Sequence, residues 1–102
     1  MTEIRREEFP EGKFSLVYLG YGEEASTPVL ELTYNWDVSF YEKGNGYGHI
    51  AIGANNIKSI CDIALKLGYK VVREPGPMKL NPSLILAFIE DPDGYLIELI
   101  EQ

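Results

Sequence analysis

The sequence predicts an α+β fold made of two related modules, the second a complete βαβββ unit and the first reduced to three strands. An apolar-apolar-Glu-Leu pattern occurs in Val29–Thr33 and again in Leu96–Ile100, and each copy ends its half of the chain. Apolar spacing typical of a helix occurs once, in the second half, among segments with the residue types of strands. We therefore expect a duplicated, strand-rich module and one domain spanning residues 1–102.

The first half contains three expected strands and no helix. Thr2–Phe9 carries charges along its length, as edge strands often do. Lys13–Tyr21 alternates Phe, Leu and Tyr with other residues, which is typical of a strand, and Val29–Tyr34 is a third strand after a polar loop. Residues 1–36 therefore form the partial first module.

The second half opens with a strand over His49–Gly53 and continues into a helix. Apolar residues at i, i+3, i+4, i+7 and i+8 predict this helix over Ile57–Leu67, with Asn55 or Asn56 as its N-terminal cap and Gly68 at its exit. Three further strands are expected: Lys70–Arg73, Leu84–Ile89 and Tyr95–Ile100. This order is strand, helix and three strands, which is a complete module over residues 49–102.

Proline and glycine mark the breaks between these elements. Residues 37–48 end in a glycine-rich run and are expected to form a linker between the modules. Pro75-Gly76-Pro77 is expected to interrupt the chain after the first of the three later strands, because proline lacks the N–H that a strand ladder uses. Asp91-Pro92-Asp93-Gly94 predicts a tight turn before the last strand.

The two modules differ in what precedes their closing strands. His49 opens the second module 49 residues before Glu98, and the same spacing counted back from Glu31 falls upstream of Met1. We therefore expect the first module to lack an opening strand and helix, together with the counterpart of His49.

Composition excludes several classes of function. The formal net charge is −7, and the 9 Lys and Arg residues form no cluster beyond Arg5-Arg6, which argues against nucleic-acid binding. No apolar run is long enough to cross a bilayer and no apolar signal core opens the chain, so we expect no membrane association and a cytoplasmic location. The one cysteine, Cys61, excludes an internal disulfide and is expected to pack on the apolar side of the helix.

Three residues are candidates for chemistry. Glu31, His49 and Glu98 each lie in an apolar strand, where an ionised group must be paired, protonated or bound to a metal. Two Glu and one His suit a divalent transition metal and leave positions open for water or substrate. Singly, each residue is also compatible with a solvated strand face or a structural role. The recurrence of Glu at the same place in both repeats, with the only His of the chain opening the second, favours a metal site.

Three segments of the sequence, taken together, resemble those of a known protein family. Residues 29–36 are Val-Leu-Glu-Leu-Thr-Tyr-Asn-Trp, residues 47–51 are Tyr-Gly-His-Ile-Ala, and residues 90–101 carry Asp-Pro-Asp-Gly followed by a strand Glu. The last motif is widespread, whereas Glu-Leu-Thr-Tyr-Asn-Trp with Gly-His-Ile-Ala is more specific. Together they resemble glyoxalase I (lactoylglutathione lyase) of the short bacterial type, within the vicinal oxygen chelate superfamily of paired βαβββ modules.

The resemblance implies an octahedral divalent metal, nickel or zinc with cobalt as a further candidate, held by Glu31, His49 and Glu98. The family's fourth ligand, a His or Gln on the opening strand, has no counterpart in this sequence. The resemblance also implies that Asn35 contacts the glutathione moiety, that Lys79 meets a glutathione carboxylate and that His49 faces the substrate as well as the metal.

The implied reaction is the isomerisation of the methylglyoxal-glutathione hemithioacetal to S-lactoylglutathione, which detoxifies methylglyoxal. We assign the catalytic base to Glu98, with Glu31 as the alternative, because both are carboxylates at equivalent places in the repeat. The family forms its sites between the two chains of a homodimer. We expect weak activity without the fourth ligand, and more if an upstream segment supplies it. The rival from another class is a metal-free or degenerate vicinal oxygen chelate binding protein without lyase activity.

Overall fold

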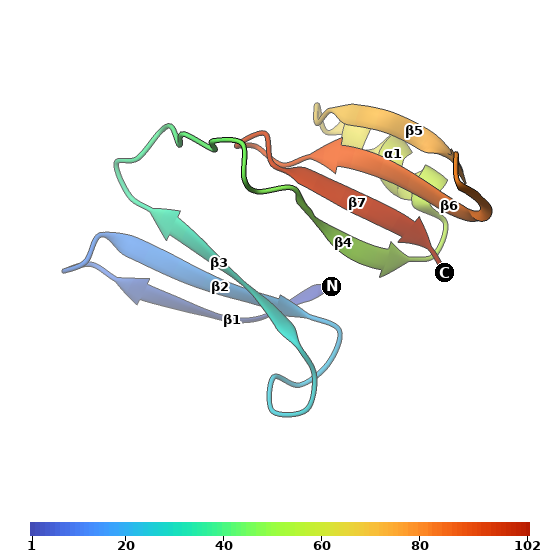
Figure 1. Cartoon of the computed structure of the whole chain (residues 1–102). Coiled ribbons are helices and arrows are strands. Elements are labelled where there is room, and N and C mark those ends of the chain that lie inside the picture. The colour runs from blue at the N-terminus through green and yellow to red at the C-terminus, as the bar shows by residue number, and fades with distance from the viewer. The chain divides into compact units, whose positions relative to one another are not determined.

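The computed structural model describes residues 1–102 and divides them into two compact units, Met1–Phe40 and Tyr41–Gln102 (Figure 1). The boundary between the units falls inside the segment 37–48 that the sequence predicts as a linker. Three strands lie in the first unit, and four strands and the one helix lie in the second. The predicted α+β class, with a complete second module and three strands in the first, is confirmed.

The first unit is a three-stranded antiparallel sheet in the order β1-β2-β3. Its strands are β1 (Thr2–Phe9), β2 (Phe14–Gly20) and β3 (Val29–Asn35). β1 is an edge strand, as its charges predict, and carries five charged residues among its eight. Charges of this kind discourage further strands from pairing at that edge.

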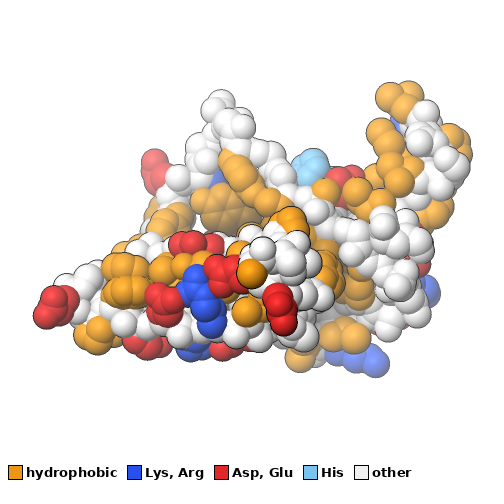
Figure 2. Space-filling model, turned by 90° about the horizontal axis from the view of Figure 1, so that it is seen from below, with side chains coloured by type: hydrophobic (Ala, Val, Ile, Leu, Met, Phe, Trp, Pro, Cys, Tyr) orange, Lys and Arg blue, Asp and Glu red, His pale blue; other side chains and the backbone are white.

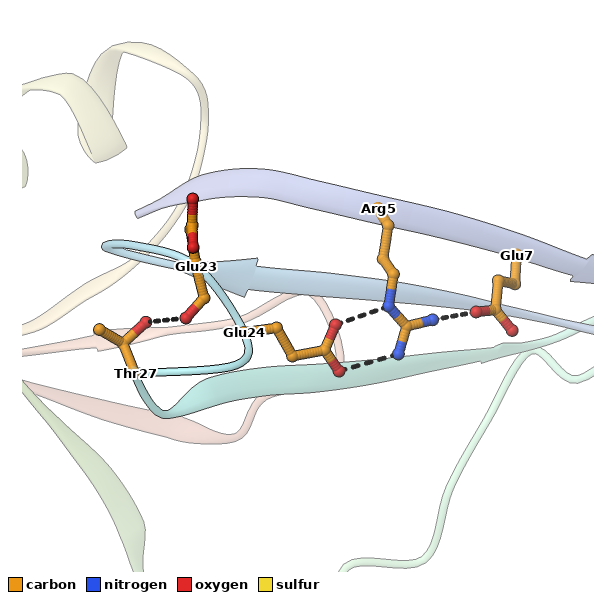
Figure 3. A network of polar contacts seen from close by, with 5 residues as sticks. All are labelled: Arg5, Glu7, Glu23, Glu24 and Thr27. Carbon is orange, nitrogen blue, oxygen red and sulfur yellow. Dashed lines mark hydrogen bonds and ion pairs between the residues drawn. The ribbon is translucent and has the colours of Figure 1, made fainter.

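The loop between β2 and β3 is tied to β1 by Arg5 (Figure 3). The Arg5 guanidinium donates to both carboxylate oxygens of Glu24, at 2.7 and 2.9 Å, and also pairs with Glu7. It lies 3.4 Å from the centre of the Tyr18 ring, which is cation–π geometry. The hydrogen bonds from Arg5 lower the pKa of the Glu24 carboxyl below its ordinary value.

The second unit is a four-stranded sheet in the order β4-β7-β6-β5. Its elements are β4 (His49–Ala54), α1 (Ile57–Lys66), β5 (Val71–Met78), β6 (Asn81–Glu90) and β7 (Leu96–Glu101). β4 runs parallel to its neighbour β7, while the other pairs are antiparallel. Both boundaries of each strand and of the helix lie within three residues of the positions that the sequence predicts, with the exception of β5.

The expected interruption at Pro75-Gly76-Pro77 is wrong, because β5 continues through these residues to Met78. Gly76 and Pro77 stand opposite Leu86 and Ile85 of β6, with register shifts on both sides of them. β5 is the edge of the sheet, so a proline there removes no hydrogen bond to a further strand, and the irregular register absorbs the change in backbone direction.

Helix α1 is capped at both ends. Asn56 adopts a left-handed conformation (φ 54°), and its side chain accepts from the Ser59 N–H at 3.2 Å. Of the two asparagines that the sequence offers as the N-terminal cap, Asn56 is therefore the one used. The Glu101 carboxylate accepts from the Asn56 and Ile57 N–H groups at 2.6 and 2.8 Å. Gly68, with φ 84°, ends the helix as predicted, in the left-handed conformation that glycine adopts without strain.

Helix α1 packs against one face of the second sheet and forms the core of that unit. The buried centre consists of Ile57, Cys61, Ala87 and Leu99. Partly buried apolar residues from the helix and the strands surround it: Ile52, Ala54, Ile60, Val71, Ile85, Ile89 and Ile97. Cys61 is packed here as the sequence predicts, and burial raises the pKa of its thiol. No helix of the chain is long and apolar enough to span a membrane.

Candidate functional site

The second sheet has one face against α1 and one face without a helix. Successive side chains along each strand point alternately to these two faces. Leu99 faces the core, so its neighbour Glu98 points to the opposite face. Glu98 stands opposite Ala51 on β4 and opposite Phe88 on β6, which places these three on the same face. His49, two residues before Ala51, shares that face. The open face therefore carries both candidate ligands of this unit.

His49 and Glu98 are in direct contact on this face. The His49 Nε2 atom lies 3.2 Å from Oε2 of Glu98, and the exposed fractions of the two side chains are 39% and 16%. The chain's single His is visible at the surface in Figure 2. Its ring also meets the Phe88 ring edge to face, with centroids 5.1 Å apart and planes at 84°. The imidazole is thus reachable from solvent, while the carboxylate is largely shielded.

The turn at residues 91–94 brings Glu98 to this position. The Asp91 carboxylate accepts from the Asp93 and Tyr95 N–H groups at 2.9 and 2.8 Å, and Gly94 takes φ 82°. This is the tight turn that the sequence predicts, and it folds β7 back along β6. The resulting register sets Glu98 opposite Phe88.

The segment before His49 is held against the same turn. Lys43 Nζ donates to the Gly94 carbonyl at 2.8 Å, and the rings of Tyr47 and Tyr95 meet edge to face at 5.5 Å. A shallow hollow of about 340 Å³ lies between these residues and is also lined by Leu96, the partner of His49 in the ladder. The entry of the chain into β4 is therefore anchored before His49 begins the strand.

The first unit places Glu31 and Asn35 on one face of its sheet. Positions 31 and 35 are an even number of residues apart on β3, so their side chains leave the strand on the same side. Glu31 stands opposite Tyr18, and Tyr18 stands opposite Arg5, so these three form a row across the sheet. Glu31 is exposed and Asn35 is half-buried.

The structure brings together His49 and Glu98, in the second unit, and places Glu31 and Asn35 in the first. Lys79 lies in the exposed turn between β5 and β6. Within each unit no group of three His, Cys, Asp or Glu side chains gathers to hold a metal ion. Imidazole nitrogen and carboxylate oxygen are donors that divalent transition metals accept, so the His49–Glu98 pair fits part of such a site.

Sequence reasoning missed Phe88. The signal for it is the tight turn at residues 91–94, since pairing the strands on either side of that turn sets Phe88 opposite Glu98. The contact between Phe88 and His49 has no such signal, because β7 separates their strands.

Residues 5–99 match the family described as the glyoxalase/bleomycin resistance protein/dioxygenase superfamily, and the chain belongs to this superfamily. Within it, the chain is 52% identical over 101 residues to a probable lactoylglutathione lyase of Synechocystis, covering 99% of this chain and 76% of that protein. It is 54% identical over 101 residues to a probable lactoylglutathione lyase of Vibrio cholerae, covering 99% and 72%.

Solved structures agree with these relatives. Glyoxalase I from Zea mays matches with a TM-score of 0.89 and 38% identity, over 99% of this chain and 36% of the longer maize chain. Glyoxalase I from Leishmania major, described as trypanothione-dependent, matches with a TM-score of 0.78 and 41% identity, over 97% and 67% of the two chains. The predicted resemblance to glyoxalase I is confirmed.

Proposed function

We propose that the chain is a metal-dependent lactoylglutathione lyase that isomerises the methylglyoxal-glutathione hemithioacetal to S-lactoylglutathione. The observation that carries this is the contact of His49 with Glu98 on the open face of the second sheet, in a chain about half identical to lactoylglutathione lyases. A solvent-accessible imidazole beside a largely shielded carboxylate, both on rigid strands, can bind and orient a small polar substrate.

The residues that would hold the metal are Glu31, His49 and Glu98. Their donor set of two carboxylates and one imidazole suits nickel, zinc or cobalt. A divalent ion bound there would act as a Lewis acid and stabilise negative charge on the substrate oxygens. The partial burial of Glu98 supports this role, because a shielded carboxylate interacts more strongly with a cation than one in open water.

Glu98 is the proposed catalytic base. It takes the proton from the carbon next to the carbonyl of the hemithioacetal and delivers it to the carbonyl carbon, while the hydroxyl proton passes to the other oxygen, so the reaction is an isomerisation that requires no redox cofactor. Glu31, its counterpart in the first unit, is the alternative for this role. A carboxylate that is mostly shielded and held beside His49 has a fixed direction for this transfer, which favours Glu98 over the exposed Glu31.

Asn35 and Lys79 are the proposed contacts for the glutathione part of the substrate. Glutathione carries two carboxylates and amide groups, which an exposed ammonium and a side-chain amide can bind. Asn35 lies on the same face of β3 as Glu31, so it would hold the substrate beside the metal. His49 completes the set of residues that face the substrate.

We further propose that the site is shared between two chains of a homodimer, with Glu31 from one chain and His49 and Glu98 from its partner, and that the protein works in the cytoplasm. The resemblance to glyoxalase I supports a shared site, since that family forms its sites between the two chains of a homodimer, and neither unit alone supplies three of the proposed ligands.

The test is formation of S-lactoylglutathione from methylglyoxal and glutathione, with nickel, cobalt and zinc added separately to the metal-free protein. We expect turnover that depends on the metal, and a loss of at least about a hundredfold in Glu98→Gln, which keeps the shape of the side chain but cannot accept the proton. Glu74→Gln, at an exposed residue of β5, is the matched control and should keep full activity. No turnover with any of the three metals in the unaltered chain would instead favour a binding protein without lyase activity.

A further inference from the structure

The side chains of His49 and Phe88 meet above the strand that separates them. His49 belongs to β4 and Phe88 to β6, and β7 lies between these strands in the sheet. Their ring centroids are nevertheless only 5.1 Å apart. The two side chains therefore lean toward each other over β7 on the open face, and the His49 ring contacts both Phe88 and Glu98.

Phe88 is well placed to hold another ring. It is half-buried, and its chain neighbours Ala87 and Ile89 pack on the opposite side of the sheet against the core. This fixes the backbone from which the Phe88 ring projects. It stands directly opposite Glu98 in the ladder between β6 and β7. The Phe88 ring and the Glu98 carboxylate are thus neighbours on the open face, and both contact the His49 imidazole.

The geometry of these contacts decides which way the imidazole nitrogen points. The two rings are nearly perpendicular, at 84°, which is the edge-to-face arrangement that aromatic rings prefer. Rotation of the imidazole about its bond to Cβ would lose this arrangement and would turn Nε2 away from Glu98, 3.2 Å distant. Without the Phe88 ring, the His49 imidazole could rotate more freely on the side that faces β6.

We propose that Phe88 is a positioning residue, which holds the His49 imidazole at the angle where Nε2 and the Glu98 carboxylate face the same point. This rests on the proposed function, in which both groups bind one metal ion. A ligand that is already oriented before binding loses less freedom when the metal arrives, so removal of the Phe88 ring should weaken metal binding without removing any donor atom.

The first experiment needs no metal and no turnover. Because His49 is the only His in the chain, its ring signals in a proton-nitrogen NMR spectrum are unambiguous. Phe88→Leu keeps an apolar side chain without the ring, Phe88→Tyr keeps the ring, and Phe40→Leu makes the same change as the first at an exposed residue. Loss of the Phe88 ring current shifts the His49 signals by itself, so line width is the readout: we expect Phe88→Leu to broaden the His49 ring signals, and Phe88→Tyr and Phe40→Leu to leave them nearly unchanged.

The second experiment measures the dissociation constant of cobalt together with the visible spectrum of the cobalt-loaded protein. We expect binding on the order of tenfold weaker in Phe88→Leu with an altered spectrum, and both restored in Phe88→Tyr. Ring signals that stay sharp together with unchanged cobalt affinity in Phe88→Leu would overturn the proposal, as would equal effects of the Leu and Tyr changes. Failure of the proposed function looks different, because the unaltered chain itself would then form no S-lactoylglutathione with any of the metals.

Discussion

The His49 Nε2 atom and the Glu98 Oε2 atom lie 3.2 Å apart although the two residues are not partners in the ladder between β4 and β7. Glu98 stands opposite Ala51, and His49 stands opposite Leu96. An offset of two residues keeps both side chains on the same face of the sheet, and the lean of the imidazole closes the remaining gap. The candidate ligands of the second unit thus meet without any loop movement.

Replacing His49 tests whether this contact is part of a metal site. His49→Ala removes one donor and leaves Glu98 with a solvent-filled gap, so cobalt affinity should fall by at least about tenfold to a hundredfold. Competition with a coloured chelator measures the change. Lys58→Ala, which breaks an exposed ion pair with Asp62 on α1, on the opposite side of the sheet, is the control and should leave affinity unchanged. Equal affinity in His49→Ala would remove His49 from the site.

The core of the second unit should be sensitive to the loss of volume at α1. Ile57 is 1% exposed and lies at the centre of the core, so Ile57→Ala should lower the free energy of unfolding by roughly 2 to 5 kcal/mol. Far-UV circular dichroism during urea unfolding reports on this unit, because α1 is the only helix. Ile63→Ala, at a residue of the same helix that is 53% exposed, should cost less than about 1 kcal/mol. Similar losses in the two variants would contradict the assigned packing.

Glu101 should contribute to stability as the cap of α1. Its carboxylate accepts from two N–H groups that have no partner within the helix. Glu101→Ala should therefore cost about 1 kcal/mol in the same urea experiment. Glu42→Ala, at an exposed residue outside the strands and the helix, is the comparison. A Glu101 variant as stable as the Glu42 variant would show that the cap has no energetic role.

The first unit should lose part of its stability in acid. Hydrogen bonds from Arg5 hold the pKa of Glu24 below its ordinary value of 4.5. A carboxyl whose pKa is lower in the folded chain stabilises the fold above its unfolded pKa, and this contribution disappears as the pH falls through the lowered value. The unaltered chain should unfold at a higher urea concentration than Arg5→Met near neutral pH. The difference between their two midpoint concentrations should become smaller as the pH falls below 4.5.

Fluorescence of Trp36, the only Trp, follows the unfolding of this unit. A gap between the two midpoints that stays constant from neutral pH into acid would show that the Arg5–Glu24 pair does not stabilise the fold. Arg73→Met, which changes the charge in the second unit by the same amount, controls for net charge.

Cys61 should be unreactive while the chain is folded. Its side chain is buried in the core, and burial raises the pKa of the thiol, so little of the reactive thiolate exists at neutral pH. A coloured thiol reagent should react at a measurable rate only after urea is added. Rapid reaction in native buffer would mean that α1 leaves the sheet easily.

Local pattern was sufficient to predict most of the fold. The spacing of Ile57, Cys61 and Ala64 defines one buried side of a helix, and Gly68 supplies the left-handed residue at its end, so both could be predicted from nearby residues. The continuation of β5 through Pro75-Gly76-Pro77 could not be predicted from nearby residues. Its outcome depends on β5 being the edge of the sheet, which only the order of all four strands reveals.

The site divides in the same way. That Glu98 points away from the core follows from its place beside Leu99 in an alternating strand. Its contact with His49 depends on the parallel register of β4 and β7, and the contact with Phe88 depends on how far the imidazole leans across the sheet. Neither relationship is encoded in the spacing along the chain.

In the proposed homodimer, Glu31 of one chain completes the site formed by His49 and Glu98 of its partner. Complementation tests it directly: metal-loaded Glu31→Gln and Glu98→Gln chains are assayed for S-lactoylglutathione formation separately, and then after the two are mixed in equal amounts and refolded together. Each variant alone should be nearly inactive. The mixture should regain about a quarter of the unaltered activity, because half of the dimers then pair unlike chains and each of these holds one intact site. A mixture no more active than its parts, beside an active unaltered protein, would contradict the shared site.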